Sequence, residues 1–322
     1  MIIQSISPSR IGLFGGSTDI PEYYQKYGGL VINFAVNIFH KYTMCYGEDL
    51  GTVGIGNQVP YGGSKEFIYT IHKAFGLDGM HHTSFKDEYE GIITGGMGAS
   101  AAAAVGIVAA INKRKNLGMS RLDIAETAWD IEVNKLGLFG GKQDQIAAAF
   151  GGFNAISFSS SGIEVNPFDR KYIDRLMPAF LLFHTGKDRV NPKIQEEFKQ
   201  PTSEQLSALY NLKELALKSI DYIGKGDIER LGLLMDEAWE FKKQSNKYVT
   251  NERIDKIYKT AKENGAFGGK IMGAGSGGFF FCIIDPDKRN KLIETLEFDF
   301  KGLSHWDFEP CMDGVLTRFL PK

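Results

Sequence analysis

Glycine clusters are the feature that most limits the folds open to this chain. The sequence has 38 glycines in 322 residues, and they gather at residues 12–16, 28–29, 95–98, 137–141, 151–152 and 265–278. Scattered glycines belong to turns, whereas clusters beside apolar segments mark close approach of the backbone to a ligand or to another element. Binding sites are therefore expected first at these clusters.

Composition and charge narrow the functional classes. Lys and Arg total 37 and Asp and Glu total 39, which gives a net charge of -2. A nucleic-acid-binding protein would be expected to carry an excess of basic residues, and this chain does not. An anionic substrate would need a local basic site. Three cysteines favour a reducing compartment, the N-terminus lacks signal-peptide features, and the longest apolar run, residues 99–111, is too short to cross a bilayer. These features predict a soluble cytoplasmic protein with neither nucleic-acid nor membrane partners.

Residue patterning predicts an α/β (α+β) fold with two domains, residues 1–175 and 176–322. In the first half we expect strands at 2–7, 30–36, 38–46, 82–93 and 153–158, and helices at 64–75, 99–111 and 120–136. In the second half we expect strands at 179–184, 279–284 and 314–319, and helices at 203–223, 228–244, 252–264 and after Pro286. The domain boundary is placed near Pro178.

The cluster at residues 95–100 runs directly into an alanine-rich helix. Its residues are Gly95, Gly96, Met97, Gly98, Ala99 and Ser100. A helix N-terminus binds phosphate through its unpaired N–H groups, and a serine there can place its hydroxyl on Mg²⁺. No Gly-Lys-Ser/Thr follows, so this is not a Walker A loop. The segment fits equally a glycine turn capped by Ser100.

A carboxylate falls on the apolar face of the helix expected at 120–136. Helical spacing places Leu122, Ala125, Trp129 and Val133 on one face, and Glu132 shares it. A buried glutamate is costly unless it is paired or bound to a metal, so a Mg²⁺ ligand would explain it. The alternative is a glutamate at the edge of the face that reaches solvent or an arginine.

A second carboxylate, Asp144, follows a pair of glycines in the sequence GGKQDQ at residues 140–145. It lies in the first turn of a short helix. One interpretation is that it complements the helix dipole. The other is that it is the catalytic base of a phosphoryl transfer, or the group that positions the attacking hydroxyl.

Three motifs in order resemble the GHMP kinase superfamily, which includes galactokinase, homoserine kinase and mevalonate kinase. They are PSRIGLFGGSTD at residues 8–19, GMGASA at 96–101 and KIMGAGSGG at 270–278. The third also fits Gly-x-Gly-x-x-Gly, but an apolar strand follows it, whereas a dinucleotide-binding fingerprint leads into a helix. The resemblance spans nearly the whole chain and implies two domains with ATP and substrate bound in the cleft between them.

The resemblance also implies roles for individual residues. The loop 95–100 would hold ATP, and Ser100 and Glu132 would be Mg²⁺ ligands. Asp144 corresponds to the catalytic aspartate, and Arg10 to the cation that keeps it ionised and stabilises the migrating phosphoryl group. Ala99 departs from the family, whose loop has a serine there, so that hydroxyl contact to phosphate is absent or supplied elsewhere.

The first motif also bears on the substrate. Galactokinases have Gly-Glu-His-Thr-Asp where this chain has Gly15 followed by Gly16, Ser17, Thr18 and Asp19. This version resembles the heptose kinase branch, which implies transfer to the anomeric hydroxyl of a sugar phosphate. Of the first and third motifs, substrate contacts are expected from Gly16, Ser17, Thr18, Asp19, Gly273 and Gly275.

A phosphorylated sugar would need a cationic pocket. We expect Lys187 and Arg189 to bind its phosphate, although the same segment fits a solvated surface turn. Three alternatives stay open: a kinase of an unphosphorylated sugar such as fucose or arabinose, an ATP-dependent decarboxylase, and a non-catalytic binding protein. The oligomeric state, including a homodimer, is open as well.

Overall fold

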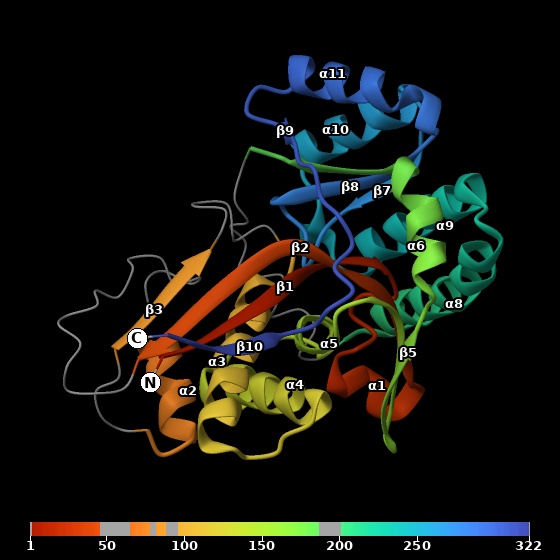
Figure 1. The fold of residues 1–322 in the computed structure, drawn as a ribbon. Coiled ribbons are helices and arrows are strands. Elements are labelled where there is room, and N and C mark those ends of the chain that lie inside the picture. Colours follow the sequence, from red (N-terminus) through yellow and green to blue (C-terminus); the bar gives the residue numbers. More distant parts are fainter. Residues whose placement is uncertain (1, 46–64, 78–81, 88–95, 187–200, 322) are drawn as a thin grey trace.

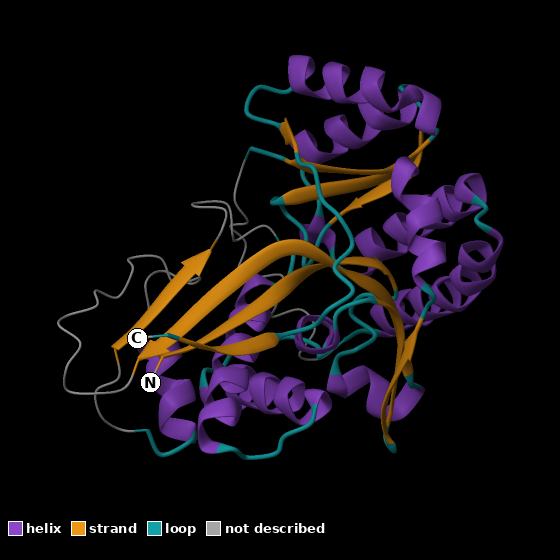
Figure 2. Ribbon diagram, viewed as in Figure 1, coloured by secondary structure: helices purple, strands orange, loops and turns teal. Residues whose placement is uncertain are grey.

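The computed structural model describes residues 2–45, 65–77, 82–87, 96–186 and 201–321, which form two β-sheets and their covering helices (Figures 1 and 2). The first sheet has the order β10-β1-β2-β4-β5, with β3 also paired to β2. Its strands are β1 (Ile2–Phe14), β2 (Gly29–Cys45), β3 (His82–Asp87), β4 (Phe153–Ser159), β5 (Gly162–Pro167) and β10 (Leu316–Leu320). The second sheet, in the order β7-β8-β6-β9, consists of β6 (Phe180–His184), β7 (Ala266–Ile271), β8 (Phe279–Ile284) and β9 (Ser304–His305).

Helices cover both sheets. In the first half they are α1 (Pro21–Tyr27), α2 (Lys65–Ala74), α3 (Ala99–Lys115), α4 (Arg121–Asp130), α5 (Gln143–Phe150) and α6 (Arg170–Leu176). In the second half they are α8 (Ser203–Lys225), α9 (Ile228–Ser245), α10 (Glu252–Glu263) and α11 (Arg289–Asp299). Figure 1 shows α2, α3 and α4 under the first sheet and α10 and α11 beyond the second. In the described part of the chain, no helix has the length and apolar character of a membrane span.

Three apolar clusters explain this arrangement. One joins the first sheet to α2–α5, and another joins the second sheet to α10 and α11. The third lies between the sheets and combines Ile11 and Phe34 with Leu212 of α8, Met235 of α9 and Phe281 of β8. Because this shared core fixes the two sheets relative to each other, a site between them is held by packing from both sides.

The α/β fold predicted from the sequence is confirmed, and most predicted elements are present. The division at residue 175 stays a prediction. The final strand β10 pairs with β1, with Ile2 opposite Leu320, so the end of the chain lies in the first sheet. We propose that residues 316–320 belong structurally with the N-terminal unit.

Strands β1 and β2 are longer than predicted. We expected a strand at 2–7 and a break between 36 and 38, but β1 continues to Phe14 and β2 is unbroken. The register shifts between Pro8 and Ser9, whose partners are Phe39 and Val36. A bulge at this point accommodates the proline, which cannot donate a backbone hydrogen bond, and lets both strands continue into the site.

The helix expected at 120–136 needs a correction. Ser120 and Asp123 form the predicted capping box, but α4 ends at Asp130 and a π-helical turn follows over Ile131–Lys135. Leu122, Trp129 and Val133 are only partly buried, so the predicted core face was wrong for these three. The buried side chains are Ile124, Ala125, Ala128, Ile131 and Glu132. π-turns occur frequently at functional sites, and this one carries the buried glutamate.

Candidate active site

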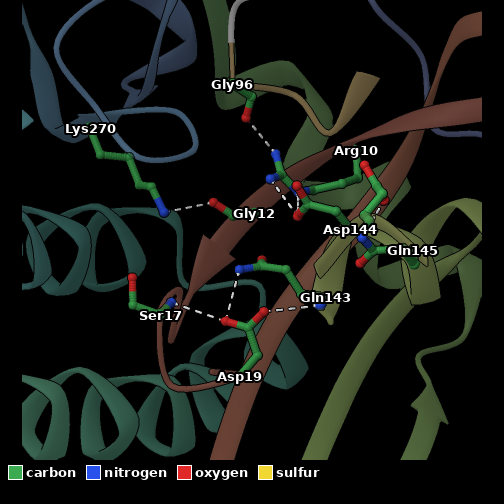
Figure 3. Close-up of polar contacts among 10 residues, drawn as sticks. Arg10, Gly12, Ser17, Asp19, Gly96, Gln143, Asp144, Gln145 and Lys270 are labelled. Carbon is green, nitrogen blue, oxygen red and sulfur yellow. Dashed lines mark hydrogen bonds and ion pairs between the residues drawn. The ribbon is translucent and has the colours of Figure 1, made fainter. Parts of the chain in front are cut away.

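An ion pair between Arg10 of β1 and Asp144 of α5 lies at the centre of the candidate site (Figure 3). Arg10 Nε and Nη2 donate to Asp144 Oδ1 at 2.8 and 2.6 Å, and Arg10 Nη1 donates to the Gly96 carbonyl at 2.7 Å. Arg10 is 4% exposed. Within the described residues, Asp144 Oδ2 accepts no hydrogen bond, so one carboxylate oxygen is held and the other is available.

The glycine-rich loop stands next to this carboxylate. Gly96 and Gly98 have φ angles of 85° and 77°, which side chains rarely adopt. A Cβ at Gly98 would lie 3.3 Å from Asp144 Oδ2. Gly98 is the N-cap of α3 and no side chain caps this helix, so its first amides face the space beside Asp144. Gly95 lies outside the described residues.

Glu132 is buried beside this loop, as the sequence predicted. Its carboxylate is 3% exposed and accepts hydrogen bonds from the Ser100 hydroxyl on Oε1 and, at 2.7 Å, from Gln145 Nε2 on Oε2. Gln145 Oε1 is buried without a hydrogen-bond partner in the described structure. The site therefore joins the start of α3, the π-turn and α5 through three oxygen-bearing side chains.

The pKa of Glu132 is raised to about 7, chiefly by burial and to a lesser degree by the negative charge of Asp144, while the hydrogen bonds from Ser100 and Gln145 act in the opposite direction. No Lys or Arg of the described chain forms an ion pair with Glu132. A buried carboxylate without a cation, together with a hydroxyl and an orphaned amide oxygen, provides the hard oxygen donors that suit Mg²⁺.

Asp19, the last residue of the first motif, links that motif to the start of α5 by hydrogen bonds. It is 1% exposed, and it accepts hydrogen bonds from the Ser17 amide at 3.1 Å, the Gln143 amide at 3.0 Å and Gln143 Nε2 at 3.2 Å. Burial raises the pKa of Asp19. A Cβ at Gly141 would come within 2.0 Å of Asp19 Oδ2. Asp19 thus caps α5 from a distant part of the sequence and holds Gln143 in place at the start of that helix (Figure 3).

The other first-motif residues divide by exposure. Thr18 is buried, and its hydroxyl donates to the Gly15 carbonyl at 2.7 Å and accepts from the Leu30 amide at 3.1 Å. Gly16 and Ser17 are partly exposed. Direct substrate contact is therefore more accessible to Gly16 and Ser17 than to Thr18, whose hydrogen bonds hold the loop against β2.

Glycines of the third motif allow close backbone contacts, one of which joins the two halves of the chain. A Cβ at Gly273 would lie 2.7 Å from the Gly96 Cα, and a Cβ at Gly275 would lie 2.6 Å from the Val249 Cα. The loop leads from β7 into β8, as expected for a motif that is not a dinucleotide fingerprint. Gly273 thus packs on the glycine-rich loop before α3, so this cluster does bring two backbone segments close together.

Two lysines that the sequence did not single out also reach the site. Lys270 Nζ donates to the Gly12 carbonyl at 2.8 Å, and Lys242 Nζ donates to Ser17 Oγ at 2.7 Å. Lys270 is the first residue of the third motif, so the sequence could have singled it out by its position. Lys242 lies in the last turn of α9, where a lysine is explained by the helix dipole alone. The predicted phosphate-binding residues Lys187 and Arg189 lie outside the described residues.

Comparison with known proteins agrees with these motifs and their geometry. The family description "GHMP kinases N terminal domain" matches residues 65–152, and "GHMP kinases C terminal" matches residues 212–302. The chain is 32% identical to the D-glycero-alpha-D-manno-heptose 7-phosphate kinase of Campylobacter jejuni, over 97% of this chain and 98% of that protein. It is 26% identical to the galactokinase of Pyrococcus furiosus, over 93% and 94% of the two chains.

Solved structures show the same fold. A D-glycero-D-manno-heptose 1-phosphate kinase from Bacteroides thetaiotaomicron superposes with a TM-score of 0.77 at 23% identity, covering 99% of this chain and 100% of the other. The galactokinase of Lactococcus lactis gives 0.75 at 17% identity, covering 98% and 95%. From its two matched domains and its full-length similarity to a sugar-phosphate kinase, the chain belongs to the GHMP kinase family.

Proposed function

We propose that this protein is an ATP-dependent kinase that phosphorylates the anomeric hydroxyl of D-glycero-D-manno-heptose 7-phosphate to the 1,7-bisphosphate. GHMP kinases use ATP as phosphate donor, and the 32% identity to a heptose 7-phosphate kinase runs over nearly the whole length of both proteins. One observation carries the chemistry: a carboxylate held by an arginine next to an uncapped glycine-rich helix start.

In the proposed mechanism, Asp144 receives the sugar hydroxyl on its available oxygen Oδ2. Arg10 fixes the carboxylate through Oδ1 and adds positive charge where the phosphoryl group passes. The first amides of α3, from Gly98 onward, would bind the triphosphate. In-line transfer then needs little movement, because each group is already placed by a buried contact.

Mg²⁺ would be held by Ser100 and Glu132, which lie together at the start of α3. When bound there it would neutralise charge on the β- and γ-phosphates. Gln145 would orient Glu132 through its Nε2–H group and is a positioning residue in this proposal.

A substrate screen tests the proposal. ATP consumption is measured with heptose 7-phosphate, the same heptose without phosphate, galactose, fucose and arabinose, each with Mg²⁺ and with EDTA. We expect the highest kcat/KM for the 7-phosphate, a product whose ³¹P spectrum shows an anomeric phosphate, and loss of turnover with EDTA. A preference for fucose or arabinose would replace the proposal by the unphosphorylated-sugar alternative, and binding of ATP without turnover of any sugar would favour a non-catalytic protein.

A further inference from the structure

The side chain of Gln143, in the first turn of α5, has one end held and the other end available. Its Nε2 group donates to Asp19 Oδ1 at 3.2 Å, and its backbone amide donates to Asp19 Oδ2 at 3.0 Å. Both oxygens of Asp19 accept from N–H groups, so the nitrogen end of the Gln143 side chain must face Asp19. Gln143 Oε1 points away from it and accepts no hydrogen bond from the described residues.

Glycines of the first motif leave room for this amide. A Cβ at Gly12 would lie 3.2 Å from Gln143 Oε1, and a Cβ at Gly16 would lie 3.7 Å from Gln143 Nε2. Glycine inside a strand weakens it and often marks the close approach of a ligand or of another group. Gln143 is partly exposed and its Oε1 is not fully buried, so this oxygen is accessible to a ligand.

The amide oxygen lies near the groups proposed to react. Arg10 and Gly12 are two residues apart on β1 with no register shift between them, so both belong to the same face of the strand. Two residues span about 7 Å along a strand. Figure 3 shows the Gln143 side chain between Asp19 and the Arg10–Asp144 pair. One small molecule could therefore place a hydroxyl on Asp144 Oδ2 and a neighbouring group on Gln143 Oε1.

The chemistry of a sugar ring limits what this neighbouring group is. The anomeric carbon has two neighbours in the ring: an oxygen, which only accepts hydrogen bonds, and C2, whose hydroxyl can donate one. An amide oxygen also only accepts, so it can pair with the 2-hydroxyl and not with the ring oxygen. An acceptor at this place therefore suits a sugar with a hydroxyl next to the one that is phosphorylated.

We propose that Gln143 Oε1 accepts a hydrogen bond from the 2-hydroxyl of the sugar substrate, and that Asp19 orients the amide for this contact. This inference rests on the proposed function and makes Gln143 a specificity-determining residue. It also gives a role to Asp19, a carboxylate 1% exposed whose desolvation is offset by three hydrogen bonds, two of them from Gln143.

The test compares heptose 7-phosphate with its 2-deoxy analogue. Gln143→Met keeps the side-chain length and removes the amide oxygen, and Gln143→Asn is a second variant that keeps an amide but withdraws its oxygen. Lys142→Met is the matched control, because Lys142 precedes Gln143 and its Nζ pairs with Glu126 of α4 at 2.7 Å. For each protein, kcat and KM are measured with both sugars, binding of both is measured by calorimetry, and a thermal melt verifies folding.

The wild type should prefer heptose 7-phosphate to the 2-deoxy analogue in kcat/KM. Both Gln143 variants should reduce that preference about 3- to 10-fold, the range for one neutral hydrogen bond. Any effect that acts through Asp19 lowers the rates on both sugars and cancels in their ratio. Lys142→Met should keep the ratio of the wild type.

A wild-type ratio in the folded Gln143 variants would overturn the inference, because Gln143 would then act on the structure alone. Equal kcat/KM for the two sugars in the wild type would overturn it as well. If heptose 7-phosphate binds more tightly than its 2-deoxy analogue through Gln143 but is not phosphorylated, only the proposed function is refuted. Absence of both binding and turnover for either sugar would refute both.

Discussion

Two ionisable side chains near the Arg10–Asp144 pair, Glu132 and Lys270, differ from that pair because neither forms an ion pair within the described residues. On one side, Glu132 is buried with hydrogen bonds from Ser100 and Gln145 but without an ion pair in the described residues. On the other, Lys270 lies near Lys242 with backbone carbonyls as its partners. The central Arg10–Asp144 pair, by contrast, is an ion pair.

This contrast separates side chains that hold the site together from side chains that would gain from a ligand. The Arg10–Asp144 pair is held in place by two hydrogen bonds between the side chains and one to Gly96. Glu132 is less favourable alone than it would be with a ligand of opposite charge. We infer that the acidic side, at Glu132, accepts a cation next to the reacting groups.

The largest loss of activity is expected when the Arg10–Asp144 ion pair is broken. Asp144→Asn should lower kcat by about 10³-fold or more and change the KM values little, because the carboxylate acts mainly in the transition state. Steady-state kinetics with both substrates measure this, with a thermal melt to verify folding. Near-normal kcat in a folded Asp144→Asn protein would remove Asp144 from the mechanism.

The second-largest loss of activity is expected from removing the charge of Glu132. Glu132→Gln keeps the shape but removes the charge, and we expect an activity loss on the order of 10²-fold from weaker electrostatic stabilisation of the transferring group. The variant should also need more Mg²⁺ for half-maximal rate. An unchanged Mg²⁺ dependence would show that Glu132 is not a ligand.

A smaller effect is expected from Gln145, which touches Glu132 without reaching the reacting atoms in our proposal. Gln145→Leu should raise the Mg²⁺ concentration for half-maximal rate about 10-fold, the usual range for a residue that orients a ligand. The KM for sugar should not change. If kcat falls at saturating Mg²⁺ while the Mg²⁺ dependence is normal, the positioning role is wrong.

The smallest effect concerns the stability of the protein and its dependence on pH through Lys270. The pKa of Lys270 is lowered from 10.5 to about 7 in the folded protein, by burial and by the charges of Lys242 on α9 and Arg10 on β1. Folding therefore bears the full cost of the charge below pH 7, and this cost disappears as pH rises toward 10.5. Relative to wild type, Lys270→Met should therefore melt at a higher temperature at pH 6 than at pH 9.5, by several degrees. A Lys243→Met control, at a lysine of α9 that pairs with Glu240, should show no such pH dependence, and a constant difference for Lys270→Met would contradict the assigned shift.

Much of the framework follows from local sequence. Most predicted helices and strands are present because apolar periodicity and capping residues act over a few positions, as at Ser120 and Asp123. The burial of Glu132 was also predicted, since helical spacing placed it with Ala125. The neighbouring prediction for Leu122, Trp129 and Val133 was wrong, because the π-turn and the packing of the helix select a different face.

Other features depend on contacts between distant parts of the chain. Asp19 caps α5 more than a hundred residues away, and β10 joins β1 at the opposite end of the sequence. Lys242 and Lys270 show no local pattern that separates them from ordinary surface lysines, since their environment arises only when α9 and β7 pack against β1.

The sequence alone thus pointed to the chemical groups of the candidate site: the glycine-rich loop and Glu132 by their own patterns, and Asp144 and Arg10 through the resemblance to the family. The first two could be found locally, because glycine conformation and a charge on an apolar helix face are properties of single positions and short spacings. The tertiary structure alone decided how charge is distributed around those groups. Electrostatic environment depends on burial and on neighbours far away in sequence, and both exist only after the two sheets share a core.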